Sequence, residues 1–254
     1  MLLAIDIGNT NTSLGVFDAD RLATHWRLTT ERSRTGDEWG VLTRNLFALA
    51  GLDFKAIDAI AIASVVPPLN FTLKRMAESY FHLTPLFVDH TVDTGLPILY
   101  HPASDVGADR IVDAVAAIKK YGAPCIVVDF GTATTFDAIN SKGEYLGGVI
   151  TPGITISADA LFERAAKLPR VEIKRPRNVV GSSTVEAMQS GLYHGYVGLV
   201  DGILKRMIDE LGGPPRVIAT GGLAALIATG SEFIEQVDET LTLEGLRLVY
   251  VRNK

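Results

Sequence analysis

The sequence predicts an α/β fold of two duplicated lobes, in which mixed sheets are flanked by helices and the active site lies in the interlobe cleft. The first observation is a β-hairpin pattern at residues 2–18, where an apolar run ends at Asp6, turns through Gly8 and resumes. The same pattern returns at residues 125–137, with Asp129 in the place of Asp6. Strand-like and helix-like segments alternate after each hairpin. We therefore expect an N-terminal lobe at 1–122 and a C-terminal lobe at 123–254.

The elements of the first lobe follow from local signals. Thr35 and Glu38 form a capping-box pattern that starts a helix, and Gly51 ends it. Pro67 and Pro68 stop a buried strand and start the next helix. In order, we expect the hairpin, a strand at 24–29, the capped helix, a strand at 57–66, a helix at 69–81, a strand at 84–89, an irregular stretch at 91–105 and a helix ending at Gly122.

The second lobe repeats this order with a longer helix. We expect a hairpin at 125–140, a strand at 145–150, a helix at 154–167, an exposed connection at 169–180, a helix at 182–211, a strand at 216–220 and a short helix through Ala228. The apolar segment at 241–251 fits either a helix or a strand, and we favour a helix.

Composition bounds the class of protein. The 254 residues are 47% hydrophobic and 21% charged, with a net charge of −5 and no basic run, which argues against a nucleic-acid partner. The start of the chain lacks the pattern of a signal peptide, and no apolar run is long enough to span a membrane. Cys125 is the single cysteine and fits a buried strand. We expect a cytoplasmic protein without a membrane partner.

The two hairpin turns have the composition of phosphate-binding turns. Glycine lets backbone N–H groups approach a phosphate, and Asn and Thr side chains add hydrogen-bond donors. Asp6 and Asp129 end the strands before the turns and could hold a cation that screens phosphates. The alternative is a pair of ordinary polar hairpin turns. Aligning Asp6 with Asp129 places Asn11 on Thr134 and Thr12 on Thr135.

Other motifs carry weaker signals. Asp109 begins a helix, where it is either a capping acid beside a solvated Arg110 or a general base beside an anion-orienting Arg110. The residues alone leave both interpretations open. Gly221 and Gly222 follow a strand and fit a tight turn or a close backbone approach to a ligand. The sequence contains no P-loop pattern, and its five histidines show no metal-ligand spacing.

Four motifs occur along nearly the whole chain: Asp6-Ile7-Gly8-Asn9-Thr10-Asn11-Thr12, Gly107-Ala108-Asp109-Arg110, Asp129-Phe130-Gly131-Thr132-Ala133-Thr134-Thr135 and Thr151-Pro152-Gly153. In this order they resemble the type III pantothenate kinase family, of the actin/sugar-kinase/heat-shock-70 superfamily. The resemblance implies an actin/ribonuclease H-like fold. It also implies ATP-dependent phosphorylation of the primary hydroxyl of pantothenate to 4'-phosphopantothenate, the first step of coenzyme A biosynthesis.

The resemblance also implies roles for individual residues. Asp109 would be the general base, and Asp129 would ligate a monovalent cation, K⁺ or NH₄⁺. The residues expected to bind the ATP phosphates are Asp6, Ile7, Gly8, Asn9, Thr10, Asn11, Thr12, Ser13 and Thr132. The residues expected to contact pantothenate are Tyr100, Gly107, Ala108, Asp109, Arg110 and Thr184. Mg²⁺ would accompany the nucleotide, and the protein would be a homodimer.

Three other functions remain compatible with these features. The first is a regulatory protein resembling Bvg accessory factor, although the acidic balance argues against direct DNA contact. The second is a kinase for another hydroxylated metabolite on the same fold, because a fold does not fix a substrate. The third is a hydrolase in which water replaces the alcohol.

Overall fold

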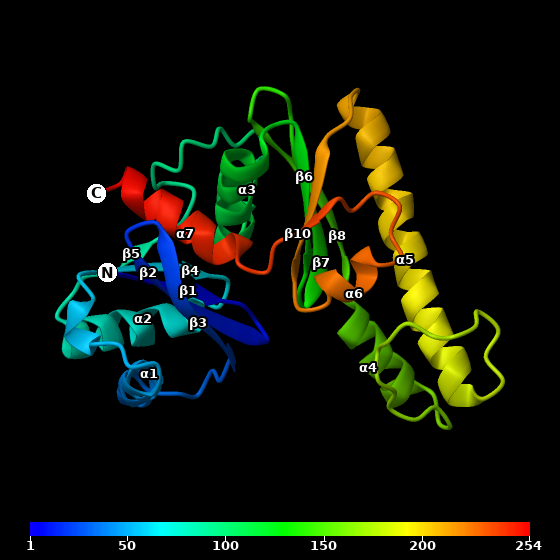
Figure 1. Ribbon diagram of the computed structural model, residues 1–254, viewed down its shortest axis with the longest axis horizontal. Coiled ribbons are helices and arrows are strands. Elements are labelled where there is room, and N and C mark those ends of the chain that lie inside the picture. The colour runs from blue at the N-terminus through cyan, green and yellow to red at the C-terminus, as the bar shows by residue number, and fades with distance from the viewer. The chain divides into compact units, whose positions relative to one another are not determined.

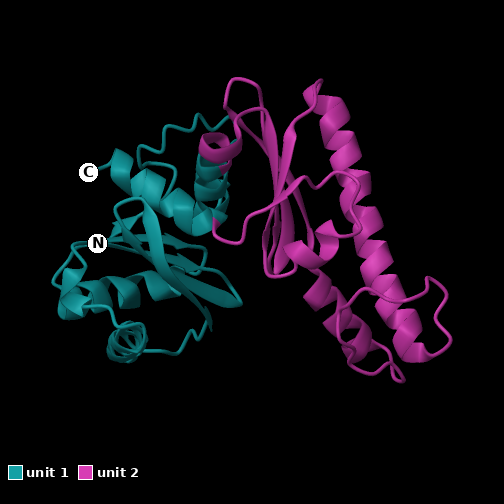
Figure 2. Ribbon diagram, in the orientation of Figure 1, with its two compact units in different colours: residues 1–116, 241–254 teal, residues 117–240 magenta.

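The computed structural model describes residues 1–254 and divides into two compact units, coloured separately in Figure 2. The first unit comprises Met1–Ala116 with Leu241–Lys254, and the second comprises Ala117–Thr240. This division differs from the expected boundary after residue 122, because the last helix lies with the first unit. Its buried side chains, Leu241, Leu243, Leu246 and Val249, explain that difference, since the helix packs against strands of the first sheet.

The first unit contains one five-stranded sheet and its helices (Figure 1). Its elements are β1 (Leu2–Ile7), β2 (Asn11–Asp18), β3 (Arg21–Thr29), α1 (Gly36–Leu49), η1 (Phe54–Ala56), β4 (Ala59–Ser64), α2 (Pro67–Met76), η2 (Ala77–Phe81), β5 (Leu86–Phe87), η3 (Ala103–Asp105), the start of α3 (Ala108–Tyr121) and α7 (Leu241–Arg252). The strand order is β3-β2-β1-β4-β5. The β3-β2-β1 part is antiparallel, whereas β4 and β5 run parallel to β1.

The second unit repeats this topology. Its elements after α3 are β6 (Cys125–Phe130), β7 (Ala133–Ile139), β8 (Tyr145–Pro152), α4 (Ile154–Arg164), α5 (Thr184–Leu211), β9 (Arg216–Gly221), α6 (Ala224–Ala228) and β10 (Gln236–Val237). The order β8-β7-β6-β9-β10 again joins an antiparallel meander to two parallel strands. The predicted fold class of two duplicated lobes with mixed sheets is therefore confirmed. The location of the active site between the lobes stays a prediction.

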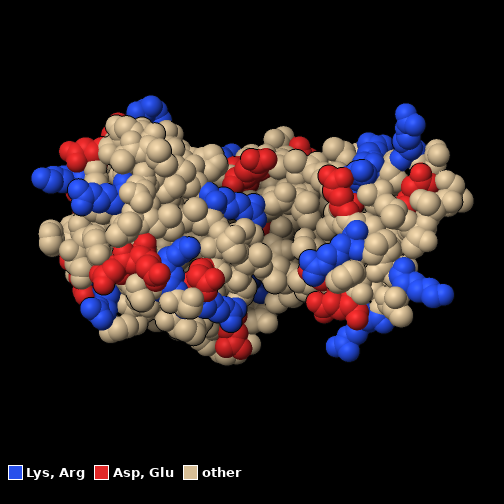
Figure 3. All heavy atoms as spheres, turned by 90° about the horizontal axis from the view of Figure 1, so that it is seen from below, with Lys and Arg blue, Asp and Glu red and all other residues tan.

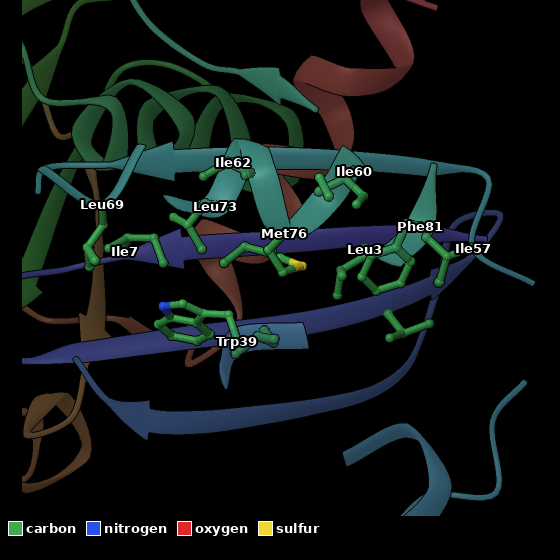
Figure 4. Packing of buried hydrophobic residues seen from close by; sticks show 14 of the residues in the cluster. Leu3, Ile7, Trp39, Ile57, Ile60, Ile62, Leu69, Leu73, Met76 and Phe81 are labelled. Carbon is green, nitrogen blue, oxygen red and sulfur yellow. The ribbon is translucent and has the colours of Figure 1, made fainter. Parts of the chain in front are cut away.

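Side-chain alternation along the strands gives each sheet two different faces. In the first unit, Ile5 and Ile7 of β1 belong to the core formed with α1 and α2. Figure 4 shows part of this core, with Ile7, Ile60 and Ile62 near Trp39, Leu69, Leu73 and Met76. The opposite face packs against α7, where Leu243 lies against Gly15 of β2. Asp6 projects on that opposite face, because it alternates with Ile5 and Ile7.

The second sheet has the same division. Ile126, Val128 and Phe130 of β6 form a core with the long helix α5. Asp129 therefore projects on the face away from this core, as Asp6 does in the first unit.

Among the helices of the structure, none combines the length and the apolar character that a membrane span requires.

The local signals in the sequence located most elements correctly. The capping box at Thr35 and Glu38 is present, and Gly51 follows α1 in a left-handed conformation with φ of 68°. The terminal segment is a helix, as favoured. Three elements are shorter than expected. The strand expected at 84–89 covers Leu86–Phe87, and the strand expected at 57–66 covers Ala59–Ser64. The helix expected at 154–167 ends at Arg164.

Candidate active site

The first turn connects β1 to β2 through residues 8–10, and Asn11 is the first residue of β2. Ile7 pairs with Thr12, and the N–H of Gly8 donates to the carbonyl oxygen of Asn11 at 3.0 Å. A Cβ at Gly8 would lie 2.9 Å from that oxygen, so the turn requires glycine. Asn9 and Thr10 are exposed, whereas the side chain of Ile7 is fully buried. Ile7 can thus present only its backbone to a ligand.

A second layer of residues holds this turn in place. The hydroxyl of Thr30 donates to the carbonyl of Gly8 at 2.7 Å and lies 2.9 Å from the hydroxyl of buried Thr12. The N–H of Thr30 also donates to the carbonyl of Thr10 at 2.9 Å. Arg32 donates to the side-chain oxygen of Asn9 at 2.9 Å. These contacts fix the direction of the turn backbone. They could not be predicted from the motif, because Thr30 and Arg32 both lie beyond it.

The second turn connects β6 to β7 and is one residue shorter. Phe130 pairs with Thr134, and the N–H of Gly131 donates to the carbonyl of Ala133 at 3.1 Å. Thr134 is therefore the equivalent of Thr12, and both threonines are buried. The expected alignment of Asn11 with Thr134, and of Thr12 with Thr135, is wrong. The strands before the two turns align as predicted, but the shorter turn shifts every later residue by one position.

The Thr151-Pro152-Gly153 motif packs directly against the second turn. The N–H of Gly153 donates to the carbonyl of Thr132 at 3.1 Å, and a Cβ at Gly153 would lie 2.3 Å from that oxygen. The hydroxyl of Tyr196 on α5 donates to the carbonyl of Pro152 and lies 3.1 Å from the hydroxyl of Thr134. The turn backbone is thus held from β8 and α5, while Thr132 itself is exposed.

Asp129 lies at the end of β6, beside the end of β9. It pairs with Thr220, and Phe130 pairs with Gly221. A Cβ at Gly221 would lie 2.5 Å from Oδ1 of Asp129, and Gly221 has a φ of 92°. Gly221, predicted to form a tight turn or to let the backbone approach a ligand, lies against the Asp129 carboxylate and makes room for it. The structure contains no cluster of three or more His, Cys, Asp or Glu side chains that could hold a metal ion.

Asp109 lies in the first turn of α3, two residues after Gly107. Its Oδ1 accepts a hydrogen bond from the backbone N–H of Arg110 at 2.8 Å. A Cβ at Gly107 would lie 2.5 Å from the same oxygen, so this glycine clears space for the carboxylate. Burial raises the pKa of Asp109, and the hydrogen bond and charge of Arg110 offset only part of that effect. A carboxylate with a raised pKa is a stronger base, which fits proton acceptance.

The remaining predicted residues have less specific surroundings. Ala108 and Arg110 are buried in the first turn of α3, and Tyr100 is half-buried in the preceding loop. Thr184 is the exposed first residue of α5, whose N-cap is Ser183. The first unit thus contains Asp6, the first turn, Tyr100 and Asp109, whereas the second contains Asp129, the second turn and Thr184.

These features are chemically suited to holding a phosphorylated ligand. Each unit has a strand-end carboxylate beside a turn with exposed residues, and the first unit adds the half-buried carboxylate of Asp109, which can accept a proton. At Gly8 and Gly221 an added Cβ would overlap a backbone oxygen or the Asp129 carboxylate, so glycine is required at both positions. This arrangement favours phosphoryl transfer over the alternative of ordinary polar turns.

Comparison with known proteins identifies the family. The family model described as type III pantothenate kinase matches residues 2–206. A type III pantothenate kinase from Anaeromyxobacter sp. (strain Fw109-5) is 60% identical over 254 residues, which are the whole of both chains.

Solved structures with lower identity share the fold. A Campylobacter jejuni protein assigned to the Baf family of transcriptional activators is 20% identical, with a TM-score of 0.60 over 99% of this chain and 98% of that one. The activator of the 2-hydroxyisocaproyl-CoA dehydratase from Clostridium difficile, solved with bound ADPNP, is 12% identical, with a TM-score of 0.55 over 99% and 94% of the two chains. At these identities the two structures bear on the fold alone. The family model and the close relative show that this chain belongs to the type III pantothenate kinase family.

Proposed function

We propose that this protein transfers the γ-phosphoryl group of ATP to the primary hydroxyl of pantothenate, the first step of coenzyme A biosynthesis. Membership of the type III pantothenate kinase family makes the chain a phosphotransferase. The structural observation that carries the proposal is Asp109, a carboxylate with a raised pKa at the start of α3. A base of this kind suits an alcohol acceptor, whose proton must leave during the transfer.

Asp109 would accept the proton of the pantothenate hydroxyl as its oxygen attacks the γ-phosphorus. The bond from that phosphorus to the bridging oxygen of ADP breaks in the same step, and ADP leaves. The hydrogen bond from Arg110 N–H to Oδ1 holds the carboxylate in one orientation. The second oxygen, Oδ2, is then the one we assign to proton acceptance.

The first turn, from Asp6 to Ser13, and Thr132 of the second turn would bind the ATP phosphates. Support comes from the exposed backbone of both turns and from the contacts that fix them, through Thr30 in the first unit and Gly153 in the second. Fixed N–H groups stabilise charge on a phosphate without reorganising during the reaction. Ile7 would contribute only its backbone, because its side chain belongs to the core.

Asp129 would ligate a monovalent cation, K⁺ or NH₄⁺, and Mg²⁺ would accompany the nucleotide. The donor chemistry fits, because Asp129 is a partly exposed carboxylate and Gly221 leaves space beside its Oδ1. A bound cation supplies positive charge that offsets the charge of the phosphates. Mg²⁺ needs few protein ligands when phosphates supply others.

Tyr100, Thr184 and the segment from Gly107 to Arg110 would contact pantothenate. Arg110 is the cationic member of this set and suits the carboxylate of pantothenate.

We also propose a homodimer in the cytoplasm. The second unit exposes large apolar side chains between residues 146 and 185, including Ile150 at 62% and Val180 at 87% relative exposure. Apolar surface of this kind is typical of a protein interface.

An assay of ADP release tests this function directly. Pantothenate-dependent ADP formation that is faster in K⁺ than in Na⁺ is the expected result. ADP release without an alcohol would indicate a hydrolase, and dependence on another hydroxylated metabolite would indicate a different kinase. No ADP release under any condition would favour a regulatory role. A regulatory role through direct DNA contact would require clustered basic residues. On the face shown in Figure 3, basic and acidic residues are instead interspersed.

A further inference from the structure

The loop between β5 and α3 carries Tyr100 and leads directly to Asp109. Over residues 88–107 its only helical element is the single turn η3, Ala103–Asp105. A segment with so little regular structure depends on side-chain contacts for its position. Loop residues between His90 and Ala103 themselves line an open pocket of about 440 Å³.

The end of the last helix, α7, clamps the start of this loop. Nε of Arg252 donates to Oδ1 of Asp93 at 2.8 Å, and the side-chain amide of Asn253 donates to the carbonyl of Asp93 at 2.8 Å. The same Oδ1 accepts from the N–H of Gly95 at 3.1 Å. Asp93 thus connects the end of α7 to the turn at Gly95. Its side chain binds Arg252 and its backbone carbonyl binds Asn253.

The shape of Gly95 matches this clamp. Gly95 has a φ of 68°, and a Cβ there would lie 2.8 Å from Cζ of Arg252. The guanidinium group therefore occupies the space that a side chain would fill. On either side of Gly95, Thr94 and Leu96 are buried, so the turn is anchored in the unit.

The same helix also contacts α3, which follows the loop. A Cβ at Gly245 of α7 would lie 2.0 Å from the carbonyl oxygen of Val112, so the two helices approach at backbone distance. Gly245 and Arg252 are seven residues apart, or about 10 Å along a helix. Buried Leu246 and Val249 hold the intervening turns against the sheet. One rigid element therefore contacts both ends of the segment that carries Tyr100 and Asp109.

Building on the proposed function, we propose that Arg252 and Asn253 are positioning residues for the alcohol substrate. They act through Asp93 and Gly95 on the loop that presents Tyr100, and they do not touch the reacting atoms. Losing the clamp should loosen the substrate loop while the phosphate-binding turn, which is held separately through Thr30, keeps its position.

Steady-state kinetics on the full-length protein test this proposal. In the Arg252→Ala/Asn253→Ala variant, we expect KM for pantothenate to rise roughly threefold to tenfold. KM for ATP and kcat should stay within about twofold of the parent values. Arg252→Lys, which retains a cationic donor, should recover part of the loss. Arg216→Ala is the matched control, because it removes another exposed arginine–carboxylate pair, Arg216–Glu235 at 2.7 Å.

Hydrogen exchange supplies a second measurement that does not depend on activity. Peptides covering residues 91–105 should exchange faster in the double variant than in the parent or in Arg216→Ala, while peptides covering β1 should not change. Unchanged exchange together with an unchanged KM for pantothenate would overturn the clamp. Absence of pantothenate-dependent ADP formation in the parent would instead contradict the proposed function, and the exchange result would still decide the clamp.

Discussion

Gly221 lies so close to Asp129 that an added Cβ would fall 2.5 Å from the carboxylate Oδ1. The same Cβ would lie 2.7 Å from the backbone nitrogen of Phe130, so no small movement relieves the overlap. The strand-end carboxylate of the second unit can therefore occupy its position only because the neighbouring strand ends in glycine. The first unit has the equivalent strand pairing. There Asp6 pairs with Ala63 of β4, as Asp129 pairs with Thr220 of β9 in the second unit.

Gly221→Ala should weaken both the fold and the response to K⁺. The added methyl group would displace the Asp129 carboxylate and strain a residue with φ of 92°. We expect the free energy of unfolding to fall by roughly 2–4 kcal/mol and K⁺ activation to be lost. Gly143→Ala is the control, because Gly143 also has a positive φ, 75°, but has open space around it. Equal losses in the two variants would contradict the role of Gly221 in making room for Asp129.

Asp109→Asn should separate catalysis from stability. Losing the base should lower kcat by roughly 10²- to 10⁴-fold, while ATP binding is retained. Burial raises the pKa of Asp109, which means that the folded protein disfavours its charged form. A neutral amide removes that penalty at neutral pH, so the melting temperature should be equal or higher. Kinetics and calorimetry of the same variant check both outcomes. Near-normal kcat would exclude Asp109 as the base.

Local patterns explain why the sequence predicted the hairpins and most helices. The β1–β2 hairpin, the capping box at Thr35 and the glycine after α1 each depend on residues within a few positions of one another. Long-range features could not be predicted in this way. The one-residue difference between the two turns depends on strand register. Because residues 134 and 135 are both threonine, the sequence does not reveal which of them pairs with Phe130. The packing of α7 on the first sheet depends on contacts between opposite ends of the chain.

The candidate site was predictable to a similar extent. The carboxylates and glycines occur in recognisable motifs, whereas the residues that fix them do not. Thr30 lies 22 positions from Gly8, and Tyr196 lies 44 positions from Pro152, so neither pattern is visible along the chain.

Thr30→Val should weaken ATP binding selectively. The substitution removes the hydroxyl that donates to the Gly8 carbonyl and contacts Thr12, while it retains the β-branched shape. The turn should loosen, and we expect KM for ATP to rise roughly fivefold with KM for pantothenate unchanged. Thr29→Val at the preceding position, the last residue of β3, is the control, because Thr29 is exposed. Parallel increases in both KM values would indicate a general disturbance of the first unit.

Asp238→Asn should change the stability of the protein and its dependence on pH. Asp238 is buried, and its Oδ2 accepts hydrogen bonds from Lys120 and from the hydroxyl of Tyr121, the latter at 2.8 Å. Burial raises the pKa of Asp238, but these hydrogen bonds outweigh burial and hold the pKa below its ordinary value of 3.8. The ionised group therefore stabilises the fold above that value, and the stabilisation is lost as pH falls through the lowered pKa.

Denaturant unfolding across pH checks this sign. Above about pH 5, Asp238→Asn should be less stable than the parent by roughly 1–3 kcal/mol, and the difference should stay constant up to about pH 8. Below about pH 4 the difference should shrink, because the parent carboxylate becomes protonated and loses its charged contacts. Glu235→Gln is the control, because its partner Arg216 is exposed and contributes little at any pH. A difference that grows toward low pH would mean that Asp238 is destabilising in its ionised form, contrary to the direction of its pKa shift.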